Sequence, residues 1–210
     1  MRNRGVLTII SGFSGVGKGT LVKALLDKYD NYALSVSATT RMPRPGETDG
    51  INYFFIRKEE FEEKIQNGAF LEYARYVDNY YGTPREYVEQ QLEAGKDVLL
   101  EIEIQGARQI KKLLPEAFTI FIMPPDAVTL KERLVGRNTE TMEVIEARLC
   151  RASEEAEGIE WYDSVLVNDN LEKSVEALHG LIQAAHCDTF RNKDFIKDIR
   201  KGVKAFSEGE

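Results

Sequence analysis

The chain has 210 residues, of which 42% are hydrophobic, and a formal net charge of −7 at pH 7. This length and composition suit one α/β domain, with or without small insertions, that buries a full core. The acidic balance argues against a broad surface for nucleic acid or anionic membranes, because such surfaces require an excess of lysine and arginine.

The chain opens with a pattern typical of a strand, a loop and a helix. The apolar run "VLTII" (6–10) ends at glycines and predicts a buried parallel strand. The segment "SGFSGVGKGT" (11–20) then has the spacing G-x-x-x-x-G-K of a phosphate-binding loop, and apolar residues at helical spacing follow Lys18. The segment order is the one that such a loop requires.

Further buried runs alternate with helical stretches along the chain. We expect strands at "ALSVS" (33–37), "DVLLEIE" (97–103), "FTIFIM" (118–123) and "SVLVN" (164–168). Alternating strands and helices indicate a parallel sheet covered by helices on both faces. We therefore predict an α/β fold.

Two segments depart from this alternation, and the chain ends in a charged tail. Residues 38–96 contain short strand-like runs around the helical stretch "KEEFEEKIQ", which predicts an inserted small α/β lobe. The irregular segment 136–144 lies between helices and suggests a mobile flap. The last twenty residues end in "SEGE", and we expect them to be frayed.

Composition also bounds the cellular context. The two cysteines, Cys150 and Cys187, lack metal-type spacing, so we interpret them as free thiols. The first apolar run is too short to span a membrane and has no cleavage pattern. We expect a cytoplasmic protein without a nucleic-acid or membrane partner.

The glycine-rich loop is the strongest chemical signal. Backbone N–H groups in such a turn, together with the following helix N-terminus, form a cradle for phosphate oxygens, and Lys18 would reach the outer phosphates. An ordinary glycine turn is the alternative. The loop has one unusual feature: the position that normally supplies a Ser or Thr hydroxyl to magnesium is Gly19.

Carboxylates follow the predicted strand 97–103. Glu101 and Glu103 close this run, and ligands of parallel sheets bind beyond the carboxyl ends of the strands. They would lie beside the loop and hold Mg²⁺ directly or through water. Solvated acidic residues at a strand end are an equally simple interpretation.

Arginines gather in two places. Arg41 and Arg44 share one loop with nearby Ser37, and two guanidinium groups suit bidentate phosphate binding. Arg133, Arg137, Arg148 and Arg151 surround the suspected flap. Solvated loop arginines and a salt-bridged helix, with Glu132, Glu143 and Glu146 as partners, are the plain alternatives.

With these residues assembled, the chain resembles the guanylate kinase family from about residue 6 to residue 185. The shared motifs are "SGFSGVGKGT", "SVSATTRMPRPGE", G-x-x-Y-x-F at 50–55, "FLEYA", "NYYGT", "QGA", "RLVGR" and "LVND". The resemblance implies transfer of a phosphoryl group from ATP to GMP with Mg²⁺, by a monomer or homodimer. It also implies a P-loop nucleoside monophosphate kinase core (5–37, 97–125 and 160–190), a GMP-binding lobe (38–96), a helical lid (126–159) and a tail (191–210).

The resemblance assigns roles residue by residue. It implies catalytic roles for Lys18, Arg133, Arg137 and Arg148. It implies ATP contacts for Gly12, Ser14, Gly15, Val16, Gly17, Lys18, Gly19, Thr20 and Asn168, the last near adenine or its ribose. It implies GMP contacts for Ser37, Arg41, Arg44, Tyr53, Glu72, Tyr81, Gly82, Thr83 and Glu103, and metal contacts through water for Glu101 and Glu103.

Three departures from the family pattern stand out. Glu101 and Glu103 replace the usual Asp-x-Asp, so each carboxylate is one methylene longer. Asn138 replaces a glycine in the lid, and Phe13, which we expect to pack rather than to bind phosphate, replaces a frequent proline. A binding module of the same family that has lost catalysis, and a kinase of another nucleotide or a phosphorylated sugar, are the competing functions.

Overall fold

A five-stranded parallel sheet forms the centre of the molecule. The structure is a computed structural model that describes residues 4–76, 78–136 and 142–208. The strand order is β2-β7-β1-β8-β9, and all neighbours are parallel, as the alternation in the sequence predicts. The strands are β1 (Leu7–Gly12), β2 (Tyr32–Leu34), β7 (Asp97–Glu101), β8 (Phe118–Met123) and β9 (Ser164–Val167).

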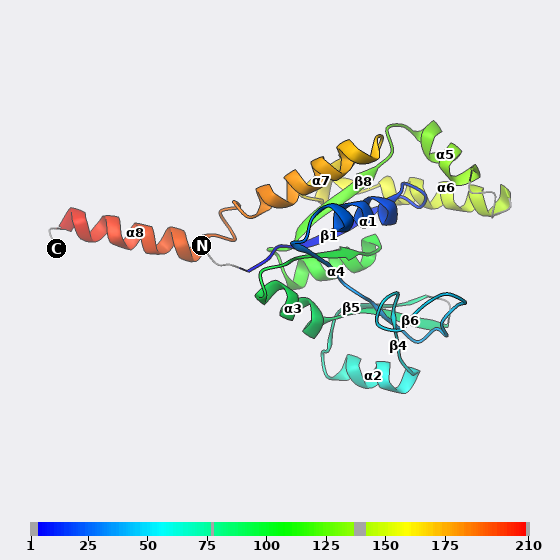
Figure 1. Ribbon diagram of the computed structural model, residues 1–210, viewed down its shortest axis with the longest axis horizontal. Helices are drawn as coiled ribbons and strands as arrows, with labels where there is room; N and C mark the ends of the chain where they lie inside the picture. The colour runs from blue at the N-terminus through cyan, green and yellow to red at the C-terminus, as the bar shows by residue number, and fades with distance from the viewer. Residues whose placement is uncertain (1–3, 77, 137–141, 209–210) are drawn as a thin grey trace.

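Helices cover this sheet and bury its apolar side chains. Ile9, Leu99 and Phe121 on three adjacent strands are fully buried, because a parallel sheet covered on both faces has no solvated side. The covering helices are α1 (Lys18–Lys28), α3 (Arg85–Glu93), α4 (Ile104–Leu113) and α7 (Leu171–Ala185). Figure 1 shows α7 and α1 on one side of the sheet and α3 and α4 on the other.

The predicted insertion forms a second, smaller sheet with its own core. Its strands run in the order β4-β3-β6-β5, and Ala38, Phe61 and Phe70 form the apolar centre. Its elements are β3 (Ala38–Thr39), β4 (Phe54–Phe55), α2 (Lys58–Gln66), β5 (Phe70–Tyr76) and β6 (Asn79–Pro84). They lie below the main sheet in Figure 1.

The range 38–96 predicted for the small lobe also includes helix α3. Helix α3, which lies inside that range, buries Val88 and Leu92 in the main core rather than in the lobe. The reason is that its apolar face meets the β7 side of the large sheet. The lobe proper therefore ends with β6.

Two helices form the region predicted as a lid. They are α5 (Ala127–Val135) and α6 (Met142–Ala156), and the 3₁₀ helix η1 (Ile159–Trp161) follows them. Asp126 caps α5, with its carboxylate accepting from the Thr129 backbone N–H at 2.7 Å. The predicted flap 136–144 is only partly within the described residues: its last residues, from Met142, already belong to α6.

The expectation of a frayed tail was wrong. Residues Lys193–Glu208 form helix α8, which extends away from the body (red in Figure 1). Its apolar residues recur at helical spacing, a signal that the many charges of the tail obscured, and they remain exposed, Phe206 at 82%. They are Phe195, Ile196, Ile199, Val203 and Phe206.

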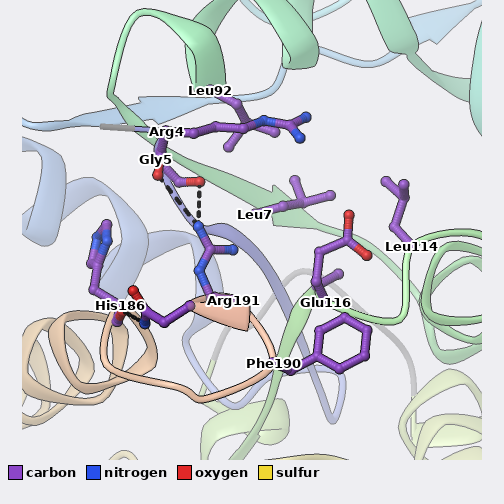
Figure 2. Close-up of a pocket in the computed structure, with 11 residues that line it drawn as sticks. Arg4, Gly5, Leu7, Leu92, Leu114, Glu116, His186, Phe190 and Arg191 are labelled. Atoms are coloured by element: carbon purple, nitrogen blue, oxygen red, sulfur yellow. Dashed lines mark hydrogen bonds between the residues drawn. The ribbon is translucent and has the colours of Figure 1, made fainter. Parts of the chain in front are cut away.

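The start of α8 is fixed to the body. Arg191 donates to the Gly5 backbone oxygen at 2.8 Å and to that of Arg4 at 3.3 Å (Figure 2). The pocket drawn there opens beside the first residues of β1, at the end of the sheet opposite the glycine-rich loop. It contains none of the predicted site residues. Within the described ranges, every helix is too short or too polar to span a bilayer.

Candidate active site

The glycine-rich loop and Glu101 lie at the carboxyl ends of two neighbouring central strands. Gly12 ends β1 and Glu101 ends the neighbouring β7, with Ile10 and Glu101 in register. Crevices beyond the carboxyl ends of parallel strands are where open α/β sheets bind ligands. The glycine-rich loop and the first acidic residue therefore lie side by side, as the sequence predicts.

The loop has the conformation that a phosphate cradle needs. Gly17 adopts a left-handed conformation with φ of 93° at the N-cap of α1, a position that residues with a side chain rarely occupy. The Lys18 ammonium donates to the Gly12 backbone oxygen at 2.6 Å and to that of Phe13 at 3.3 Å, so it folds back over the loop. Phe13 packs against Phe121 with ring centroids 5.0 Å apart, which confirms that it packs.

Two polar side chains hold the loop by hydrogen bonds to backbone oxygens. The buried Asn168 amide donates to the Val16 backbone oxygen at 2.9 Å. Arg133 of α5 donates to the backbone oxygens of Asn168 at 2.9 Å and of Val16 at 3.3 Å. Asn168 therefore helps to shape the glycine-rich loop. A contact with adenine or its ribose would be in addition to this support.

The lid helices also contact the loop directly. Arg148 of α6 donates to the Ser14 hydroxyl at 3.1 Å. A methyl group added at Gly15 would lie 2.7 Å from a Leu134 side-chain carbon, so α5 packs on the loop at this glycine. Arg137 lies outside the described residues. Two of the three predicted lid arginines therefore reach the glycine-rich loop.

The two carboxylates predicted as a pair have different environments. A methyl group at Gly19 would lie 3.7 and 3.8 Å from the Glu101 carboxylate oxygens, so Glu101 faces the loop. Glu103 is not on the strand but at the N-cap of α4, where it pairs with Arg151 of α6 at 3.1 Å. The crevice raises the pKa of Glu101 through desolvation, which the Lys18 ammonium opposes and the Glu103 charge reinforces.

The donor groups beside the loop suit magnesium held jointly with a nucleotide. Carboxylate oxygens are ligands that Mg²⁺ accepts, and this ion usually keeps several waters when phosphates bind it. Over the described ranges, no three His, Cys, Asp or Glu side chains converge on one metal position. Among the described residues, Glu101 carries the carboxylate nearest to Gly19, the loop position that usually supplies the hydroxyl.

A buried carboxylate marks the small lobe. Glu72 of β5 is 8% exposed and accepts a hydrogen bond from the Thr83 hydroxyl at 2.7 Å. A methyl group at Gly106 of α4 would lie 3.0 Å from a Glu72 oxygen, so this glycine lets the carboxylate approach the core. Burial raises the pKa of Glu72, and the Thr83 hydroxyl and N–H partly offset the shift. Packing explains the glycine at position 82, because a methyl group there would lie 3.0 Å from the Phe61 ring.

The predicted phosphate-binding residues of the lobe form two groups. Arg41 lies 5.3 Å from the Tyr53 ring centroid, and the Tyr53 and Tyr81 rings are 6.0 Å apart. Burial raises the pKa of the Tyr53 hydroxyl. Arg44 is exposed, its backbone N–H donates to the Glu47 carboxylate at 2.7 Å, and its charge helps to lower the pKa of Glu47. Ser37 lies just before β3, half-buried, where its backbone oxygen accepts from Phe54 at 2.9 Å.

Three residues without a predicted role belong to this arrangement. Glu47 pairs with Arg41, Gly106 makes room for Glu72, and Arg151 holds Glu103. Glu47 and Gly106 fall within motifs "RMPRPGE" and "QGA". Gly106 and Arg151 have partners far away in the sequence, and Glu47 has several charged neighbours with which it could pair. Only the fold shows which partner each residue has.

Comparison with known proteins identifies the family. The family model described as guanylate kinase matches residues 4–185. The chain belongs to the guanylate kinase family. The guanylate kinase of Listeria innocua is 47% identical over 205 residues, covering 97% of this chain and all of the relative, and that of Clostridioides difficile is 51% identical over 193 residues, covering 92% and 94%.

A solved structure supports the same assignment. The crystal structure of guanylate kinase from Anaplasma phagocytophilum superposes with a TM-score of 0.70 at 33% identity, covering 90% of this chain and 89% of that one. Family membership accounts for the combination of a glycine-rich loop, an inserted lobe and an arginine-bearing helix pair on one parallel sheet.

Proposed function

We propose that this guanylate kinase family member transfers the γ-phosphoryl group of ATP to GMP, giving ADP and GDP. The observation that carries the substrate assignment is the buried Glu72 carboxylate in the small lobe, held by Thr83. The Gly12–Lys18 loop, the support from Arg133 and Arg148, and the family relationship support ATP as the donor. Both nucleotides are available in the cytoplasm, where we expect the chain to act.

Guanine recognition follows from the chemistry of its edge. Guanine presents two adjacent donors, the N1–H and the N2 amine, and an ionised carboxylate is an acceptor only. Adenine presents an acceptor at N1 and lacks the amine, so Glu72 would face a lone pair. Sites built to bind a specific polar edge reject the wrong one by about 10⁴-fold when buried groups are left unpaired.

Phosphoryl transfer by this site depends on positioning and charge. The reaction passes through a loose transition state that asks little covalent chemistry of the protein. Lys18, Arg133 and Arg148 would hold the ATP phosphates and the transferring group, and Arg41 and Arg44 would hold the GMP phosphate. Magnesium bound with Glu101 would supply further neutralisation of the ATP phosphates. Contact of α5 and α6 with the loop would exclude water, which otherwise accepts the phosphoryl group.

The decisive experiment offers GMP, AMP, CMP and UMP in turn to the purified chain with MgATP in a coupled assay of ADP release. We expect GMP to exceed AMP in kcat/KM by about a hundred-fold or more, allowing for imperfect geometry below the full discrimination. Equal rates for GMP and AMP would refute the guanine assignment but leave the fold intact. Binding of GMP without any turnover would favour the family's non-catalytic binding module instead.

A further inference from the structure

The loop that carries Arg41 and Arg44 is organised around one carboxylate. Glu47 accepts from Arg41 Nη1 at 2.9 Å and Nη2 at 2.8 Å, and from the Arg44 backbone N–H at 2.7 Å. Its own N–H donates to the Arg44 backbone oxygen at 3.0 Å. The side chains of Arg41 and Glu47 are only 15% and 19% exposed, so this bidentate pair is sheltered from water.

The same pair is held against aromatic rings. The Arg41 guanidinium carbon lies 5.3 Å from the Tyr53 ring centroid and 5.7 Å from that of Phe55. One Arg41 N–H also reaches the Met42 backbone oxygen at 2.7 Å. A guanidinium has five N–H donors, so these contacts fix its plane without exhausting its donors. Arg41 can therefore bind an anion while it keeps Glu47.

A bound phosphate would not simply displace Glu47 from Arg41, because the Glu47 carboxylate accepts three hydrogen bonds within the loop. Moving its carboxylate away would break both guanidinium bonds and the bond from the Arg44 backbone, and would open the turn. Hydrogen bonds between ionised groups are about twice as strong as neutral ones. The pair thus acts as part of the loop and presents its outward N–H groups in one orientation.

We propose that Glu47 is a positioning residue for the phosphate of GMP. It holds the Arg41 guanidinium and the Arg44 backbone in the arrangement that the phosphate meets, so the substrate need not order them. The inference rests on the proposed function and adds a residue to the GMP site. Its signature is specific: loss of the Glu47 charge weakens binding of the nucleotide phosphate and leaves recognition of the base unchanged.

The test is Glu47→Gln, which keeps the shape and removes the charge. Steady-state kinetics give kcat and the two KM values, and calorimetry gives Kd for GMP and for guanosine, which lacks the phosphate. We expect the GMP KM and Kd to rise about ten-fold, the size of one charge-assisted bond's advantage. The kcat, the ATP KM and the guanosine Kd should stay within about two-fold of wild type, since P-loop and base contacts are intact.

Glu63→Gln is the matched control, because Glu63 is exposed on α2 of the same lobe. An unchanged GMP Kd in Glu47→Gln, or tighter GMP binding, would overturn the proposal. So would a parallel loss of guanosine binding, because the whole lobe would then be disturbed. Failure of the proposed function is a different result: wild type itself would not phosphorylate GMP, and the proposal for Glu47 would fall with it.

Discussion

The ATP loop and the GMP lobe hold their cationic side chains in different ways. Arg133 and Arg148 donate to neutral groups of the loop, the Val16 backbone oxygen and the Ser14 hydroxyl. Arg41 of the lobe is paired with the Glu47 carboxylate. In the proposed reaction, ATP would meet a loop that Arg133 and Arg148 already brace, whereas GMP would meet the Arg41–Glu47 ion pair and the exposed Arg44. The comparison suggests that loop cations serve the reacting phosphates and lobe cations serve placement.

The sharpest test of the loop half is Lys18→Ala. We expect kcat to fall by about 10²–10³, because a positioned charge on the transferring group acts mainly in the transition state. The KM values for ATP and GMP should change by only several-fold. Steady-state kinetics with both substrates varied measure this split. Lys23→Ala, exposed on α1, is the control and should match wild type.

The guanine side is tested by Glu72→Gln. A glutamine cannot accept from both guanine donors, so kcat/KM for GMP should fall about ten- to a hundred-fold, the value of a hydrogen bond to a charged group. Activity with AMP should not fall in parallel. An equal loss with both nucleotides would remove Glu72 from base recognition.

Glu72→Gln, which should lower activity with GMP, should by contrast raise the stability of the folded protein at high pH. Burial raises the pKa of Glu72 in the folded protein, so folding favours its protonated form. The corresponding stabilisation is complete below the ordinary pKa of 4.5 and is lost as pH rises through the raised pKa. Glu72→Gln should therefore melt at a higher temperature than wild type at about pH 8, and the difference should shrink towards about pH 4. Thermal melting across this pH range measures it.

The placement role of the lobe cations is tested by Arg44→Ala. The Arg44 guanidinium is exposed and lies on the lobe rather than beside the glycine-rich loop, so its loss should act mainly on GMP. We expect the GMP KM to rise about ten-fold or somewhat more, with kcat and the ATP KM within a few-fold. Arg57→Ala, at the N-cap of α2 in the same lobe, is the control. A fall in kcat with an unchanged GMP KM would contradict the view that lobe cations place GMP while loop cations act on the reacting phosphates.

Periodicity explains why much of the fold could be predicted from the sequence. Buried runs such as "FTIFIM" gave β8, and "KEEFEEKIQ" coincides with α2. The misassigned parts depend on packing partners. Helix α3 follows the lobe in the chain but buries its apolar face in the core. Helix α8 has a clear apolar stripe that its lysines and aspartates concealed.

Side-chain partners explain why the site was predicted less completely. Alternation along a strand would place Glu101 and Glu103 on the same side, but the strand ends at Glu101 and the turn into α4 redirects Glu103 to Arg151. The Arg41–Glu47 pair competes in the sequence with many other possible ion pairs. Residue types and spacing predicted candidate groups for the site, and the fold shows which of these side chains pair with which partners.

The smallest expected effect concerns the missing hydroxyl at Gly19. A methyl group there would lie 3.7 Å from a Glu101 oxygen, so a serine hydroxyl would lie beside a carboxylate that already faces the loop. Magnesium keeps several waters beside nucleotide phosphates, and the added hydroxyl would replace only one of them. Gly19→Ser should therefore change kcat by no more than several-fold at any magnesium concentration.

Glu101→Gln should raise the magnesium concentration needed for half-maximal rate, whereas Glu103→Gln should not, because Glu103 faces Arg151. Rates of the three variants across one magnesium titration decide the matter. A large gain in rate from Gly19→Ser at low magnesium would show that magnesium binding at the loop, and not GMP binding in the lobe, limits the activity of this chain.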